Sequence, residues 1–364
     1  HAMPSLLHVL ALLLATAPAT GASPASDAAT LAPNLSSCHL ATGLPAGQAP
    51  FNCCAPLPPY QPRLFRPPPP TPSRRLRVRH PAHLASPKAA HTLARAYSLM
   101  KALPDHDPRS FTQQANIHCA YCDAAYQMGN SSTPLQVHTS WLFFPFHRWY
   151  LYFHERILAK LLSDDNAHGP EGVAAEEEEA FSLPFWNYDI PEGASMPWMY
   201  TQIPPLNQAN RDTAHLPPAV VPIDYLTYNS PDQRPLPTQI RENQAYLYRA
   251  LIRNSDSKYT FHGQPYRHGD DPMPGYGSCE KYPHNTVHLW IGSKPDSALG
   301  GLDMGYFYAS ARDPLFYPHH AAIDRLWEVW LRLPGNSHLD DLEYLDAEFA
   351  FYNEEAEMVR VKVR

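Results

Sequence analysis

The sequence predicts a mainly α-helical fold with long proline-rich loops and a few short strands at its periphery. Two stretches, residues 116–156 and 280–327, combine histidines with apolar side chains at helical spacing. The 41 proline residues interrupt regular structure elsewhere, so the helices should be short and the connections irregular. Alternating apolar and polar residues near the end, at 348–352 and 358–364, indicate short strands.

Composition allows a sizeable core and argues against two kinds of partner. Hydrophobic residues make up 44% of the 364 residues and aromatic residues 12%, enough for one large domain or two ordinary ones. With 28 basic and 35 acidic residues the formal charge is −7, which disfavours nucleic acid or an anionic membrane as the main partner. The apolar run at residues 6–15 is shorter than the about 20 residues that span a bilayer, and no other stretch could span one.

Residues 1–30 are interpreted as a targeting segment. The apolar run leads into small residues, as in the cleavage zone of an export signal, although no Lys or Arg precedes it. The six cysteines favour an oxidising compartment, because the adjacent Cys53 and Cys54 would form two separate bridges more readily than one strained bond. The alternative is that the cysteines are free, buried thiols.

Residues 31–85 are expected to form a proline-rich arm that carries cysteines, has no core of its own and is stapled to the rest of the chain. Ser86-Pro87 then opens a helix with apolar residues at helical spacing, which ends before Pro104. The acidic residues 164–180 are expected to be solvated. A further helix is expected near residues 238–253.

Three histidines mark the first informative stretch. His138 and His147 are nine residues apart, about two and a half helical turns, so on one continuous helix they would face opposite ways. We therefore expect Pro145 to break the pattern and let both converge. His118, one turn before Cys122, can supply a third imidazole. From His147 onward the segment is apolar nearly all round, which is typical of a helix at the centre of a domain.

The second stretch supplies another trio. His284 and His288 are four residues apart, so a helix places both on one face. His320 is favoured over His319 as the third member, because it shares a helical stripe with Asp324 and further residues. Three neutral imidazoles with an open position suit copper, zinc, iron or nickel. A single buried histidine is usually structural, but two such trios in one chain are much rarer by chance.

Longer motifs around these histidines resemble a known family. The segment from His138 through Phe-Phe-Pro-Phe-His-Arg-Trp-Tyr-Leu resembles the first copper motif of tyrosinases, and Asp-Pro-Leu-Phe-Tyr-Pro-His-His, ending at His320, resembles the second. The stretches Asn-Ile-His-Cys-Ala-Tyr-Cys and Pro-Phe-Trp-Asn-Tyr-Asp are similar to plant polyphenol oxidases over roughly residues 34–364. The resemblance implies a type-3 dicopper centre in a four-helix bundle. It also implies oxidation of small phenolic substrates, o-diphenols, to o-quinones by dioxygen.

The resemblance assigns roles to individual residues. It implies that one copper is held by His118, His138 and His147, and the other by His284, His288 and His320. The positions of the family's thioether are Cys122 and His138, and those of its two disulfides are Cys38–Cys54 and Cys53–Cys119, which leaves Cys279 without a partner. Phe307 matches an aromatic gate over the second copper.

Three further residues are expected to support the centre. Glu280 matches the glutamate that holds a water in the resembling enzymes, and the amide oxygen of Asn285 is expected to orient the same water. A base reached through one water would permit some monophenol hydroxylation beside diphenol oxidation. Asp324, one turn after His320, is expected to support a ligand without binding metal.

The resemblance also sets expectations for domains and location. Residues 86–364 are expected to form the dicopper catalytic domain with the arm packed on it, and the family's C-terminal shielding domain is expected to be absent. The thylakoid lumen is expected from the family, and the vacuole or cell exterior from the signal-like start. Two rival functions use similar residues: a haemocyanin-like dioxygen carrier and a dizinc hydrolase.

Overall fold

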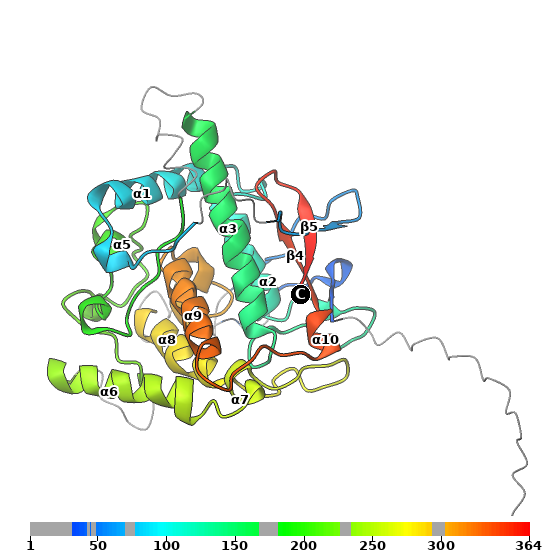
Figure 1. Ribbon diagram of the computed structural model, residues 1–364. Coiled ribbons are helices and arrows are strands. Elements are labelled where there is room, and N and C mark those ends of the chain that lie inside the picture. The colour runs from blue at the N-terminus through cyan, green and yellow to red at the C-terminus, as the bar shows by residue number, and fades with distance from the viewer. Residues whose placement is uncertain are drawn as a thin grey trace, which may run out of the picture.

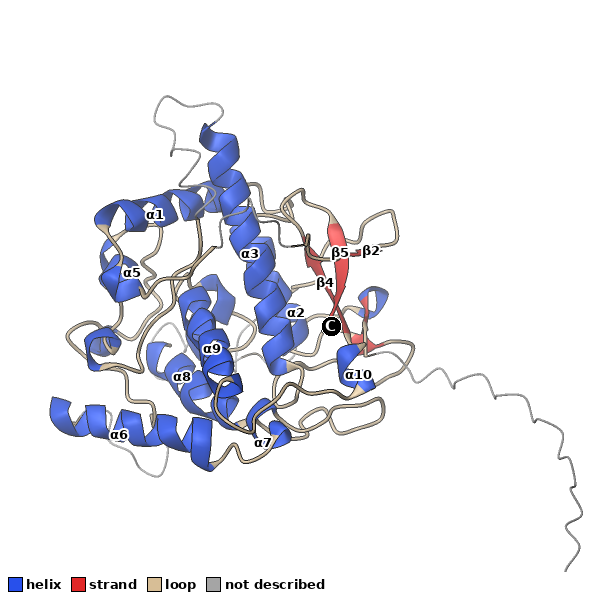
Figure 2. Ribbon diagram, in the orientation of Figure 1, coloured by secondary structure: helices blue, strands red, loops and turns tan. Residues whose placement is uncertain are grey.

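The structure is a computed structural model that describes residues 31–41, 44, 49–69, 77–166, 181–225, 234–292 and 303–364. The expected targeting segment, residues 1–30, lies outside them, as do parts of the arm and of the acidic stretch, residues 42–43, 45–48, 70–76 and 167–180. Helices dominate the described residues, as predicted, and Figure 2 shows the short strands together at one side.

Helices that carry the histidines occupy the centre of the fold (Figure 1). They are α2 (Phe111–Cys122), α3 (Phe143–Asn166), α8 (Thr286–Ile291) and α9 (Phe316–Leu331). The helix α3 packs against α9, while the helical turn before α8 contacts α9 as well. The predicted helical bundle is thereby confirmed.

The central helix α3 is buried along most of its length. Its residues Leu151, Ile157 and Leu158 are fully buried, so it runs through the core as expected. Pro145 does not break it, contrary to the expectation. Because the helix begins at Phe143, Pro145 lies in the first turn, where its missing N–H leaves no intrahelical bond unmade. The histidines converge because His138 lies in the loop before the helix.

Serine caps fix the starts of two helices near the centre. The helix α1 (Pro87–Ala102) begins after Ser86, whose hydroxyl accepts from the Ala89 amide at 3.2 Å, and it ends before Pro104 as predicted. Ser110 caps α2 in the same way through the Gln113 amide at 3.2 Å. The helix α1 packs against α3 and α2. The two caps therefore fix the residues at which two core helices begin.

Shorter helices surround the centre. They are α5 (Trp198–Gln202), α6 (Leu236–Tyr248), α7 (Lys258–His262) and α10 (Leu342–Leu345), with π-helical turns at Arg249–Arg253 and Glu280–Asn285. Short 3-10 turns lie at Leu35–Ser37, Ala82–Leu84, Pro191–Gly193, Thr213–His215, Asp303–Gly305 and Ser310–Arg312. The helix expected near residues 238–253 is therefore α6 and the π-turn that continues it.

The strands attach the N-terminal arm. The predicted C-terminal strands are β4 (Glu348–Tyr352) and β5 (Met358–Lys362), an antiparallel pair, and β2 (Arg63–Leu64) of the arm adds to β5 in parallel. A second small sheet pairs β1 (Pro33–Asn34) with β3 (Gln127–Met128). Among the described helices none is both long and apolar enough to cross a bilayer.

Candidate metal centre

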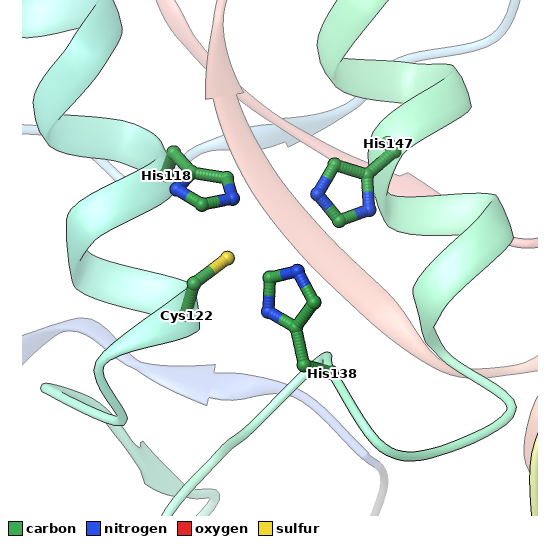
Figure 3. A group of neighbouring side chains, drawn as sticks. All are labelled: His118, Cys122, His138 and His147. Atoms are coloured by element: carbon green, nitrogen blue, oxygen red, sulfur yellow. The ribbon is translucent and has the colours of Figure 1, made fainter. Parts of the chain in front are cut away.

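Three imidazoles and one thiol form the first cluster (Figure 3). The ligand atoms of His118, Cys122, His138 and His147 all lie within 4.8 Å of one another, and all four residues are buried. His118 and Cys122 come from α2, His147 from α3 and His138 from the loop between them. In Figure 3 the imidazoles converge on one point, and the Cys122 sulfur is directed at the His138 ring.

The second cluster joins His284, His288 and His320, whose ligand atoms also lie within 4.8 Å of one another. His284 lies in the π-turn before α8, His288 in α8 and His320 in α9. The two clusters face each other, since the His147 and His320 rings stack at 4.1 Å between centroids. The structure thus brings together all six predicted histidines in one buried centre.

Hydrogen bonds fix the tautomers of four imidazoles. The Nδ1 atoms pair with the Phe307 carbonyl at 3.0 Å for His118, the Phe143 carbonyl at 2.8 Å for His147, the Asn285 side-chain oxygen at 2.9 Å for His284 and the Met304 carbonyl at 3.1 Å for His288. Each partner is an acceptor, so Nδ1 must carry the hydrogen and Nε2 keeps a lone pair. This is the form in which an imidazole binds a metal.

The remaining nitrogens fit a metal ion. In the described structure the Nε2 atoms of His118, His147 and His284 are buried without a hydrogen-bond partner, and so are both nitrogens of His138. A buried polar atom left without a partner costs about 1–3 kcal/mol. Since several such lone pairs gather at each cluster, bound ions would satisfy them together. The absence of carboxylates from both trios favours a transition metal over magnesium or calcium.

The six imidazoles are neutral at physiological pH. Burial lowers the pKa of His147 to about 3 and that of His288 to about 4. Burial, together with the other imidazoles nearby, also lowers the pKa of the other four well below its ordinary value. Metal can therefore bind without first displacing protons from the ligands.

Asp324 acts on the helices rather than on an imidazole. Its carboxylate accepts from Arg148 Nε at 2.5 Å and from Arg79 Nη1 at 3.1 Å, and no bond to a ligand histidine occurs in the described residues. Arg148 directly follows His147, and Asp324 lies one turn after His320. The ion pair therefore ties α3 to α9 and holds the two clusters in register.

Phe307 lies elsewhere than expected. Its ring stacks on that of His138, 4.6 Å between centroids at 16°, so it covers the first cluster and not the second. The Phe307 side chain is 40% exposed and thus forms part of the surface above the centre. The sequence motif identified the residue but could not show which trio its loop crosses.

Glu280 and Asn285 lie in the same π-helical turn as His284, a member of the second cluster. Glu280 is fully buried; Oε1 accepts from the Thr139 amide at 2.7 Å, while Oε2 is buried without a partner in the described structure. Burial raises the pKa of Glu280 well above its ordinary value. The Asn285 amide oxygen accepts from His284 Nδ1 at 2.9 Å, and its second lone pair is the part of the amide that could orient a water.

Two disulfides and two free thiols account for the cysteines. The structure contains Cys38–Cys54 and Cys53–Cys119, and the second joins the arm to α2. Cys122 and Cys279 are free and buried. The bond from Cys53 ends directly after His118, so it also anchors a ligand-bearing helix.

Sequence reasoning missed the backbone acceptors at the site, and it set His319 aside as a ligand without giving it a role. The carbonyls of Met304 and Phe307 hold imidazoles, but carbonyls occur at every residue and carry no sequence signal. His319 stacks on His284, 5.5 Å between centroids at 14°, with both ring nitrogens buried and unpaired in the described structure. His319 therefore packs against His284 but is not part of the second cluster.

A buried histidine outside the clusters predicts acid sensitivity. Burial lowers the pKa of His262 to about 4, below its ordinary value near 6.5. The unfolded chain binds this proton first, so His262 supports stability above pH 6.5 and this support is lost as pH falls towards 4. Between pH 7 and pH 5, the free energy of unfolding of the wild type should fall by about 2 kcal/mol more than that of His262→Gln. Urea unfolding at both pH values measures this, and parallel pH curves would contradict it.

Comparisons with known proteins show which family the chain belongs to. The family model described as the common central domain of tyrosinase matches residues 108–333, and the one described as the polyphenol oxidase middle domain matches residues 338–364. The chain is 44% identical over 337 residues to aureusidin synthase of Antirrhinum majus, covering 92% of this chain and 56% of that protein. It is 45% identical over 335 residues to the chloroplastic polyphenol oxidase of Malus domestica, covering 91% and 53%.

A solved structure agrees with these relatives. The crystal structure of Grenache (Vitis vinifera) polyphenol oxidase superposes with a TM-score of 0.81 at 41% identity, covering 92% of this chain and 93% of that one. The chain spans about half the length of the curated relatives it matches.

Proposed function

The chain belongs to the tyrosinase family and resembles its plant polyphenol oxidases over 91% of its length; from this we propose that it is a copper oxidoreductase that oxidises o-diphenols to o-quinones with dioxygen. One observation carries the proposal. Six neutral, buried imidazoles lie in two adjoining trios, with Nε2 lone pairs left for metal. His118, His138 and His147 would hold one copper ion, and His284, His288 and His320 the other.

The residues of the chain would position the reaction rather than perform it. Two bound copper ions would supply the redox chemistry, in which two diphenols each lose two electrons and two protons while one dioxygen becomes two waters. The exposed Phe307 ring offers an apolar surface for a phenol ring above His138. The pair Arg148–Asp324 keeps the helices of the two trios together.

The chain's organisation and location follow from the same family. We treat residues 31–85 as an arm packed on the catalytic unit 86–364, supported by the bond Cys53–Cys119 and the pairing of β2 with β5. The apple relative is named chloroplastic, which supports a plastid for this chain. The thylakoid lumen would supply the oxidising conditions that disulfides need, with the vacuole or cell exterior as the alternative.

Metal analysis and a turnover assay test the function. We expect about two copper ions per full chain and oxygen uptake with a simple catechol, matched by quinone formation. Copper binding without turnover would indicate a dioxygen carrier of the haemocyanin type. Zinc in place of copper, with hydrolytic activity, would indicate a dizinc hydrolase.

Cys122 and His138 are expected to become cross-linked in the copper-loaded protein. The sulfur lies with the His138 ring in one buried cluster, and burial raises the pKa of the Cys122 thiol, so it is a neutral thiol before any reaction. A thioether removes one hydrogen from sulfur and one from a ring carbon, with dioxygen as the acceptor. The link would fix the orientation of His138, which no hydrogen bond to its ring fixes in the described structure.

Peptide mapping after reduction and alkylation detects the cross-link between Cys122 and His138 directly. The linked peptides should lack two hydrogens beyond the disulfides, and Cys122 should resist alkylation. Cys279 is the internal control, because it is also a free, buried cysteine but lies outside the metal clusters. Full alkylation of both cysteines in copper-exposed protein would rule out the link.

Monophenol hydroxylation is expected beside faster diphenol oxidation, with Glu280 as the group that holds the required water. Its Oε2 is buried and unpaired in the described residues, and a monophenol must lose its proton near the metal. Asn285→Gly should lower activity on tyramine more than activity on dopamine. The reason is that the glycine removes both the amide beside the centre and the acceptor for His284 Nδ1.

Copper content separates these two effects of Asn285→Gly. With copper retained, a selective loss on tyramine supports a role of the amide in proton removal. Equal proportional losses on both substrates, or no tyramine hydroxylation by the wild type, would refute it.

A further inference from the structure

One short segment contacts a histidine of each trio from outside. Residues Asp303–Arg312, here called the bridging segment, connect to α9 and contain two 3-10 turns. Its Met304 carbonyl accepts from His288 Nδ1 at 3.1 Å, and its Phe307 carbonyl accepts from His118 Nδ1 at 3.0 Å. Among the hydrogen bonds of the described residues, no other segment serves an imidazole of both trios.

The contact with His118 has a second member. Ser310 Oγ lies 3.2 Å from His118 Nδ1 and 3.4 Å from the Phe307 carbonyl, and Ser310 is 1% exposed. The hydroxyl can donate to the Phe307 carbonyl while it accepts from the imidazole. Because His118 and Ser310 are buried, these hydrogen bonds strongly favour one tautomer and one orientation of the His118 ring.

Glycines bring the bridging segment against the helix of the second trio. Gly292 follows the last residue of α8, and a Cβ added there would lie 2.5 Å from both Cα and N of Gly305. That distance is too short for any side chain, so the backbones touch. The contact places Met304, the neighbour of Gly305, within reach of His288.

Both ends of the bridging segment are held by one loop. Asn210 Nδ2 donates to Asp303 Oδ2 at 3.1 Å, and Gln208 Nε2 donates to the Arg312 carbonyl at 3.2 Å. The same loop reaches α8, where the Asp212 amide donates to the Ile291 carbonyl at 3.0 Å. This loop thus fixes the position of the bridging segment relative to α8, independently of the contact with His118.

We propose that the bridging segment is a positioning element shared by the two trios, so that displacing it weakens metal binding at both. The proposal rests on the proposed function, since it takes the six histidines as copper ligands. Groups that hold a ligand imidazole typically change metal affinity by about 10–100-fold. A shared element should show this effect at two ions, whereas an ordinary support would show it at one.

The two touching glycines supply a matched pair of variants. In Gly292→Ala the added methyl meets the Gly305 backbone at 2.5 Å, although φ of −61° and ψ of 152° suit alanine. The clash must therefore push the bridging segment and the end of α8 apart. In Gly305→Ala the added methyl lies 3.5 Å from Gly292 Cα, an ordinary contact, so the segment stays in place.

Copper retention by the full, copper-loaded chain is the readout. We expect Gly292→Ala to release both ions to a chelator about tenfold faster or more, while Gly305→Ala releases them like the wild type. Anomalous diffraction at the copper edge then gives the occupancy of each trio separately. Losses from the second trio alone, or from neither, would overturn the proposal.

A second variant covers the case in which Gly292→Ala fails to fold. Asn210→Ala removes the amide that holds Asp303 without adding bulk, and faster release from both trios is again expected. Unchanged release from either trio would overturn the proposal. Full copper without diphenol oxidation in the wild type would refute the proposed activity alone, whereas a wild type that binds no copper would refute both.

Discussion

We expect the replacement of His288 with alanine to empty the second trio of metal and to abolish diphenol oxidation. His288 Nε2 lies 3.2 Å from His320 Nε2, so both nitrogens point at one position that an ion would occupy. With His288 gone, two imidazoles remain, fewer than the three protein ligands of an open catalytic site. The loss of turnover should exceed the roughly 100-fold that follows removal of a mere supporting group. Copper analysis should find about one ion per chain in place of two.

His154→Gln is the matched control for this variant. His154 is also a fully buried histidine, seven residues after His147 in α3, but its Nε2 pairs with the Tyr97 hydroxyl at 3.1 Å and its ring stacks on Tyr317. The control should lose stability while it keeps both copper ions. Full activity of the His288 variant, or equal copper loss in both variants, would contradict the assignment of His288 as a ligand.

The spacing of residues along helices predicted the convergence of the histidines. His284 and His288 share a helical face by their separation alone, and the stripe through His320 and Asp324 favoured the member of an adjacent histidine pair that the structure places in the second cluster. Periodicity works for His118, His147, His288 and His320 because each lies on a helix, whereas His138 lies in a loop. The metal itself came from resemblance, since imidazole spacing suits several transition metals.

Contacts made by loops could not be predicted in this way. The position of Phe307 over His138 depends on how the bridging segment crosses the centre, and no periodic pattern describes that path. Asn285 lies next to His284, but only the structure shows that its oxygen is engaged by the imidazole. Pro145 was misread because a proline breaks a helix interior yet fits the first turn, and the start of the helix was unknown.

Long-range pairing was also beyond the sequence. The two C-terminal strands alternate clearly and were predicted, but β2 of the arm is only Arg63–Leu64 and pairs with β5 nearly three hundred residues later. A strand that short has no period to detect. Its pairing depends on where the rest of the chain places an open sheet edge.

Replacing Asp313 with alanine should cause a large loss of stability. Asp313 pairs with Arg211 through two short contacts, Nη2 to Oδ1 at 2.6 Å and Nε to Oδ2 at 2.7 Å, and the side chains are 1% and 2% exposed. Arg211 also donates to the Tyr200 carbonyl and, at 2.9 Å, to the Leu206 carbonyl. The pair therefore joins the loop before residue 212 to the start of α9.

The expected size follows from the charge that the variant leaves behind. Without Asp313 the Arg211 guanidinium stays buried and unpaired, which costs about 3–5 kcal/mol. The Leu315 amide, which donates to Asp313 Oδ1 at 2.8 Å, also loses its acceptor just before α9. Chemical denaturation of the copper-loaded chain should therefore show a much lower midpoint.

An exposed ion pair supplies the control that shows whether the loss of stability in Asp313→Ala comes from a buried, unpaired charge. Arg95 and Asp165 are joined at 2.7 Å with side chains 53% and 30% exposed, so Asp165→Ala should cost no more than about 1 kcal/mol. The double variant Arg211→Met with Asp313→Leu removes both buried charges and should recover much of the loss, because no charge is then left unpaired. If Asp313→Ala cost no more than Asp165→Ala, or if the double variant were less stable than the single one, the buried pair would not hold α9 in place as argued.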